Sequence, residues 1–117
     1  MPFRFERLEI WRLARAYVNS IYEITACFPR IETYGLASQL NRAANSIALN
    51  IAEGAGRDSN RQFDRFLTIA IASVYEVAAG LSLALDRGYI DQATHARLYE
   101  EADKLGRKIN SFRKTLR

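Results

Sequence analysis

The chain holds few side chains that could act as nucleophiles, general bases or metal ligands. Its only histidine is His95 and its only cysteine is Cys27, so neither a nucleophile–base pair, a zinc-type ligand cluster nor an intrachain disulfide can be assembled. Glu100 and Glu101 point to different sides of a helix, and a di-metal site in a bundle would also require a Glu-x-x-His pair, which is missing. We therefore expect no catalytic residue, no metal, no cofactor, no small-molecule substrate and no enzymatic activity.

A lone carboxylate, Glu76, lies in the middle of the apolar run FLTIAIASVYEVAAGLSLAL, residues 66 to 85. Twenty such residues match the thickness of a bilayer core. However, a glutamate at the bilayer centre costs about 2 to 4 kcal/mol or more on insertion scales, and no other segment could span with this one. We expect no membrane contact and interpret the run as a helix that is covered on both sides.

The positive charge of the chain is concentrated at its C-terminal end. Residues 104–117 contain six bases and no acid, whereas the other 103 residues contain 11 bases and 13 acids. These candidate phosphate-binding residues are Lys104, Arg107, Lys108, Arg113, Lys114 and Arg117. A solvated helix end, where cations complement the helix dipole, is the alternative interpretation. Tyr34 and Tyr89 are the candidates for stacking on bases, and nothing indicates sequence-specific readout.

These residues must be positioned by helices, because the chain has only two prolines and no long alternating runs of the strand type. Helix breakers occur at FPRIETYG, EGAGRDS and DRGYID and divide the chain into four helical segments. Ser59 and Asp91 are placed as N-caps, and Gly54 or Gly56 and Gly88 as C-terminal stops. The glycines at 54–56 end a helix and lack the lysine of a phosphate-binding loop. The sequence predicts one domain, residues 1–117, with an all-α fold: an antiparallel up-down-up-down four-helix bundle.

Two segments carry more apolar surface than an isolated bundle needs. The fourth has a narrow stripe, but the third adds Ile69, Ala72, Ala79 and Leu83 behind its core-facing residues, and the first is apolar over more than half its circumference. We expect a second copy of the chain to cover this excess, which predicts a homo-oligomer. Glu76 would then be buried and would need a donor on the second segment, either Arg42 or Asn50. Together with Glu53, these residues form the predicted structural polar network.

Several motifs resemble those of a known family. The run YGLASQLNRAANSIALNIAEG (34–54), RFLTIAIASVYE (65–76), GYI (88–90), FERLEIW (5–11) and the FP at 28–29 are similar to the four-helix-bundle proteins encoded in intervening sequences of bacterial 23S rRNA genes, also called S23 ribosomal proteins. The resemblance implies an antiparallel bundle that assembles as a ring, expected to be a pentamer. A related bundle is a basic, nucleic-acid-binding accessory protein of reverse transcriptases in retroelements.

The chain departs from this family pattern at four positions. Asn41 stands where the family tends to have an arginine, Ile71 and Ala72 replace an arginine and a glycine, and Ala48 replaces a frequent proline. The loss of two basic positions weakens the case for an RNA-binding surface on the second and third helices. It leaves the predicted fold unchanged.

The sequence therefore predicts a non-enzymatic, homo-oligomeric bundle whose basic C-terminal helix binds RNA weakly and without sequence specificity. The alternative is a protein–protein assembly or adaptor module that binds no nucleic acid itself. The opening MPFRFERLEIW lacks the apolar block of a secretory signal, so we expect a cytoplasmic location.

Overall fold

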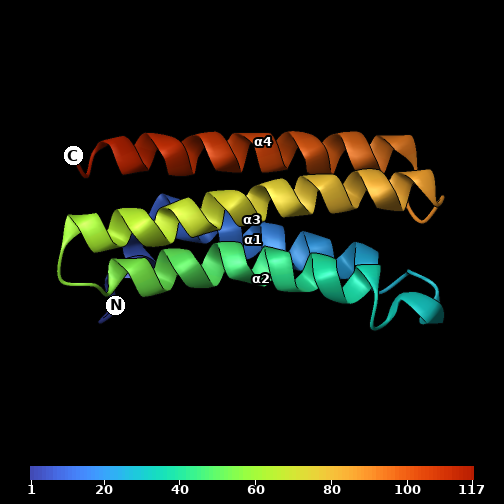
Figure 1. Cartoon of the computed structure of the whole chain (residues 1–117), viewed down its shortest axis with the longest axis horizontal. Helices are drawn as coiled ribbons and strands as arrows, with labels where there is room; N and C mark the ends of the chain where they lie inside the picture. The colour runs from blue at the N-terminus through green and yellow to red at the C-terminus, as the bar shows by residue number, and fades with distance from the viewer.

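The computed structural model describes all 117 residues and contains four long helices (Figure 1). They are α1 (Glu9–Thr25), α2 (Leu36–Ala55), α3 (Asn60–Asp86) and α4 (Gln92–Lys114), with short 3₁₀ turns η1 (Arg4–Arg7) and η2 (Arg30–Glu32) before α1 and α2. Consecutive helices run antiparallel, and α4 packs mainly on α3 while touching α1 more lightly. The predicted all-α, up-down-up-down four-helix bundle is confirmed, with overall dimensions of 43 × 22 × 22 Å.

The predicted N-caps and helix-ending glycines act largely as predicted. The Ser59 hydroxyl accepts a hydrogen bond from the backbone N–H of Gln62, and the Asp91 carboxylate accepts one from Thr94. Gly88 adopts φ +74°, a left-handed conformation that glycine tolerates without strain. Gly54, by contrast, does not stop a helix: α2 continues to Ala55, and Gly56 is its C-cap. These caps fix where the helices begin and end, and so which residues share an end of the bundle.

A continuous apolar core lies along the bundle axis. The predicted stripes of α3 and α4 are buried in it, including Leu67, Leu81, Leu98 and Ile109. At one end the core is closed by η1, where the Phe5 ring meets Trp11 edge to face at 4.7 Å between centroids. One apolar face of each helix therefore supplies the core, as the spacing predicts.

The broad apolar arc of α1 is covered within the chain. Leu13, Val18 and Ile24 are half-buried against the core, and Tyr17 is buried. η1, α2 and α4 together enclose more of α1 than a single packing stripe would. The contribution of the remaining apolar surface of α1 to a subunit interface stays a prediction.

The outward side of α3 is not covered by the chain. Ile69 and Leu83 are 49% and 46% exposed, and Ala72 and Ala79 between them are exposed as well. By length and composition α3 is apolar enough to cross a membrane, and 39% of its most apolar window is buried inside the bundle. A core helix of a globular protein passes the same test, so this apolarity alone does not indicate a membrane span.

Candidate nucleic-acid interface

Both chain termini and the α2–α3 turn lie at one end of the bundle (Figure 1). This end comprises residues 1–7, 53–65 and 113–117, and we call it the basic end. Its cations are Arg4, Arg7, Arg57, Arg61, Arg65, Arg113, Lys114 and Arg117. Its carboxylates are Glu6, Glu53, Asp58 and Asp64. Bases outnumber acids there by eight to four, so this end carries a net positive charge.

The opposite end has the reverse balance. It comprises residues 23–36 and 84–95 and holds four carboxylates and two arginines. The net charge therefore changes from positive to negative along the long axis of the bundle. This charge asymmetry would attract a polyanion to the basic end and orient it there.

Some cations of the basic end are held by the fold. Arg113 donates from Nε to Asp64 Oδ1 at 2.7 Å and from Nη2 to Oδ2 at 3.4 Å, which ties the end of α4 to the start of α3. This hydrogen bonding lowers the pKa of Asp64 below its ordinary value. Arg57 pairs with Glu53 at 3.2 Å, and its guanidinium lies 4.6 Å from the Phe66 ring centroid.

Other cations of the basic end are free to meet a ligand. Arg61, Arg65, Lys114 and Arg117 are exposed and form no ion pair within the chain. They come from the first two turns of α3 and from the end of α4. Exposed cations without a carboxylate partner are the groups that exchange counterions most readily for phosphates.

The six cations predicted on the C-terminal segment fall into two groups. Arg113, Lys114 and Arg117 are at the basic end, whereas Lys104, Arg107 and Lys108 lie mid-helix among carboxylates. Arg107 pairs with Asp103 at 3.1 Å and Lys108 with Glu9 of α1 at 3.2 Å, and Lys104 is exposed and unpaired. The mid-helix group is therefore a mixed-charge surface rather than a continuation of the basic end.

Sequence reasoning missed the five arginines at positions 4, 7, 57, 61 and 65. They are far from the C-terminus in the chain and only the antiparallel arrangement brings them to it. The sequence did contain a signal for these arginines. In an up-down bundle every second loop lies at the same end, so the charges of the N-terminus, the second helix break and the C-terminus could have been summed as one surface.

The two predicted base-stacking tyrosines occupy the other end. Tyr34 is 97% exposed in the turn before α2. Tyr89 is half-buried, donates its hydroxyl to Glu32 Oε2 at 2.8 Å, and packs against Phe28 at 5.1 Å between centroids. The structure therefore gives Tyr89 a packing role, and neither residue adjoins the basic end.

The predicted polar network around Glu76 is not formed. Glu76 is exposed and makes neither a hydrogen bond nor an ion pair within the chain, and Arg42 is likewise exposed and unpaired. Asn50 donates instead to the carbonyl and hydroxyl oxygens of Ser46, and Glu53 pairs with Arg57. The reason is the orientation of α3, which aims Glu76 outward along the stripe Ile69, Ala72, Ala79 and Leu83.

The polar link between α2 and α3 is made by hydroxyl groups. Ser73 donates to Ser46 Oγ at 2.7 Å, one helical turn from Glu76, and Asn50 completes the network. No buried side-chain nitrogen or oxygen lacks a hydrogen-bond partner, and no group of three His, Cys, Asp or Glu side chains could hold a metal ion. The polar groups between these helices are thus satisfied inside the chain.

Comparison with known proteins identifies the family. The profile of the 23S rRNA-intervening sequence proteins matches residues 6–111, nearly the whole bundle. The chain belongs to this family. It is also similar to a crystal structure from Bacteroides thetaiotaomicron VPI-5482, described as a protein of unknown function from the S23 ribosomal protein family. That match has a TM-score of 0.80 and 19% identity, and it covers 90% of this chain and 98% of that one. No match to a curated protein was found.

The family assignment confirms the resemblance drawn from the motifs. At 19% identity the structural likeness shows a shared fold, and the function of that relative is itself unknown. What this family member does must therefore be argued from its own surface.

Proposed function

We propose that this family member is a non-enzymatic, cytoplasmic, homo-oligomeric bundle that binds RNA through its basic end, by phosphate contacts and without sequence specificity. The observation that carries the proposal is the gathering of eight cations from three separate parts of the chain around only four carboxylates. Four of these cations have no partner in the chain. The family's description, which refers to intervening sequences of 23S rRNA, is consistent with RNA as the polyanion.

Association of several copies of the chain would strengthen RNA binding through the basic end. The stripe on α3 formed by Ile69, Ala72, Ala79 and Leu83 is exposed, and a soluble bundle gains by covering it with a second copy. Glu76 in the centre of the stripe and Arg42 on α2 both lack partners within the chain, so each is available to a neighbouring subunit. We propose a ring, expected to be a pentamer, in which repeated basic ends make weak contacts additive.

A salt titration with paired charge variants tests the RNA proposal. We expect the affinity for RNA to fall steeply with ionic strength, and Lys114→Gln with Arg117→Gln to weaken binding and flatten that salt dependence. The matched control is Arg30→Gln with Arg87→Gln, which removes two exposed, unpaired arginines from the opposite end. Equal losses in both variants, or no RNA binding at low salt, would contradict the proposal.

The exposed stripe on α3 also favours the alternative, an assembly or adaptor module without nucleic-acid binding. In that case Leu83→Lys abolishes association with the partner, while the double variant at the basic end has no effect on it. Light scattering of the purified protein tests self-assembly separately from RNA binding, since a 13.3 kDa species would refute self-assembly.

A further inference from the structure

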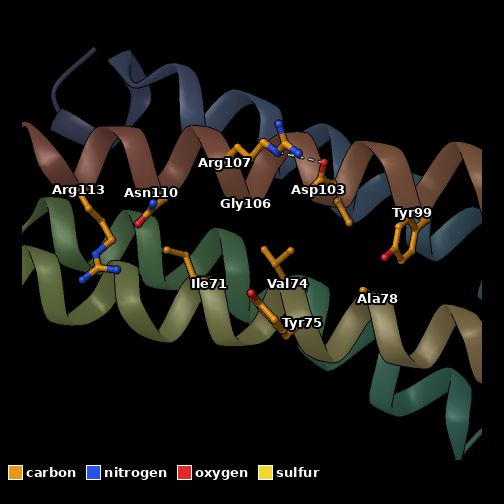
Figure 2. A pocket seen from close by; sticks show the side chains of 11 residues that line it. Ile71, Val74, Tyr75, Ala78, Tyr99, Asp103, Gly106, Arg107, Asn110 and Arg113 are labelled. Atoms are coloured by element: carbon orange, nitrogen blue, oxygen red, sulfur yellow. Dashed lines mark ion pairs between the residues drawn. The ribbon is translucent and has the colours of Figure 1, made fainter.

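A groove lies between α3 and α4 on the outside of the bundle (Figure 2). Its volume is about 480 Å³, within the range of sites that bind small ligands. Its apolar lining comes from Ile71, Val74 and Ala78 of α3 and from Ala102 of α4. Gly106 of α4 lies across the groove from Val74 (Figure 2). None of these residues belongs to the exposed stripe that we assign to self-assembly.

Gly106 contributes no side chain to the groove. A Cβ atom added there would lie 3.5 Å from Val74 Cγ1, an ordinary van der Waals contact, so packing does not require a glycine. The same addition at Gly54 or Gly80 would clash with Phe66 or Leu40. A glycine inside a helix also costs stability relative to alanine. At position 106 the chain thus bears that cost without a packing reason.

The rim of the groove combines aromatic, amide and cationic groups. Tyr75 is 74% exposed and Tyr99 is 51% exposed, and the His95 ring stacks near Tyr99 at 5.6 Å, which helps to hold that ring in place. Asn110 offers both a donor and an acceptor. Arg107 lies on the same rim, and Figure 2 shows it extended toward Asp103.

The groove is continuous with the basic end through Arg113, which lines both. Its ion pair with Asp64 uses two of the five guanidinium N–H donors, so three remain for a ligand. An RNA strand held by Lys114 and Arg117 would therefore have the groove directly beside it along α4. Of the charged groups that line the groove, two are cations and one, Asp103, is an anion.

We propose that this groove binds an unpaired nucleotide of single-stranded RNA; this inference rests on the proposed function and adds to it a preference for unpaired strands. The base stacks on the ring of Tyr99 or Tyr75, because aromatic stacking accepts any base. Asn110 hydrogen-bonds the base edge, and Arg107 and Arg113 contact the flanking phosphates. The Arg107–Asp103 pair is exposed and so is readily exchanged for a phosphate. A base-paired strand cannot use the groove, since its bases are stacked inside the duplex.

The test measures fluorescence anisotropy of a short single-stranded RNA and of the matching RNA duplex at low salt, with an adenine analogue in the single strand to report stacking. Wild type is expected to prefer the single strand and to quench the analogue. Tyr99→Ala and Gly106→Leu should each weaken single-strand binding about tenfold and leave duplex binding unchanged. Tyr99→Phe should restore the wild-type affinity, because the ring is kept.

Two controls make the outcomes separable. Tyr34→Ala removes an exposed tyrosine at the opposite end and should change nothing. Lys114→Gln with Arg117→Gln should weaken single strand and duplex alike. Circular dichroism and melting confirm that each variant folds, and Gly106→Met, whose longer and more flexible side chain can also occupy the groove, replaces Gly106→Leu if the latter does not fold.

The groove assignment is overturned if Tyr99→Ala and the Gly106 variant bind single strands as wild type does while the double variant at the basic end weakens binding. Failure of every form to bind RNA would instead overturn the proposed function itself. If the groove variants lower the solution mass and leave the RNA affinity intact, the groove receives a second copy of the chain, and the nucleotide assignment is wrong.

Discussion

Two glycines inside helices show how differently one residue type can be used. At Gly54 a Cβ atom would lie 2.7 Å from Phe66 Cβ and 2.8 Å from Phe63 Cδ1, so α2 and α3 meet there only because no side chain intervenes. At Gly106 the nearest atom would be 3.5 Å away. The first glycine serves the packing of the bundle and the second does not.

We predict opposite signs for the two alanine substitutions. Gly54→Ala should lower the free energy of unfolding by about 1–3 kcal/mol, because the phenylalanines around it are packed too closely to move aside. Gly106→Ala should raise it by about 0.4–1 kcal/mol, since the residue is helical and the methyl group has room. Urea unfolding followed by circular dichroism measures both, and stabilisation by Gly54→Ala would show that the helices can separate there without loss.

Glu32 connects the two loops at the end opposite the basic one. Its carboxylate accepts the Leu36 backbone N–H at 2.9 Å and the Tyr89 hydroxyl at 2.8 Å. These hydrogen bonds lower the pKa of Glu32 below its ordinary value of 4.5 in the folded chain. The carboxylate thus ties the start of α2 to the α3–α4 turn.

This contact should make stability depend on pH in the acid range. Because the folded pKa is depressed, the contribution of Glu32 is fully present above the unfolded value and is lost as the pH falls through the folded value. The difference in Tm between wild type and Glu32→Gln should therefore be largest at neutral pH and shrink below pH 4.5. Glu100→Gln, at an exposed and unpaired position, is the control and should show no such trend. A difference that stays constant with pH would mean that the charge of Glu32 is immaterial.

At the scale of elements, α4 is the helix with the fewest attachments to the rest of the bundle. It contacts α3 along its length and α1 more lightly. A polar side chain of each of these two helices also contacts α4. Arg113 reaches Asp64 of α3, and the Tyr17 hydroxyl of α1 donates to the Leu98 carbonyl at 2.8 Å. Burial raises the pKa of Tyr17, so this hydroxyl remains a donor at physiological pH.

Loss of the Tyr17 hydroxyl should loosen α4 selectively. Tyr17→Phe keeps the ring and removes one buried hydrogen bond, which should cost about 1 kcal/mol in unfolding free energy. Hydrogen exchange should increase most in the first turns of α4, around Leu98. Tyr99→Phe removes an exposed hydroxyl and serves as the control. Equal effects of the two variants, or faster exchange throughout the bundle, would argue that α4 does not depend on this contact.

At the scale of the whole molecule, two exposed surfaces support the proposed function. One is the apolar stripe of α3 and the other is the positive charge of the basic end. They serve the two parts of the proposed function, because the first associates copies of the chain and the second multiplies phosphate contacts once copies are associated.

If the stripe is an assembly surface, stability must depend on protein concentration. We expect the Tm of wild type to rise with concentration, because association favours the folded state by mass action. Leu83→Lys should abolish this dependence and reduce the solution mass, whereas Ala96→Lys, which adds the same charge at an exposed position on α4, should do neither. A wild-type Tm that is independent of concentration, together with a monomeric mass, would refute assembly.

Much of the fold could be predicted because helix formation and core selection are local. Ser59, Asp91 and Gly88 mark helix ends through hydrogen bonds and dihedral angles that involve only near neighbours in the chain. The 3.6-residue periodicity of the apolar residues within α3 and within α4 likewise identified the core faces of these helices before any packing was known. The family resemblance depended on the same local motifs.

The sequence by itself therefore determined four amphipathic helices, their boundaries, their core faces and the excess apolar surface of α3. Only the tertiary structure decided which charges act together. Arg61 of α3 and Arg117 of α4 share the basic end because antiparallel helices return to it, whereas Lys108, close to Arg117 in the chain, is paired with Glu9. It also decided that Glu76 faces outward, because the rotation of a helix about its axis is set by all of its packing partners together.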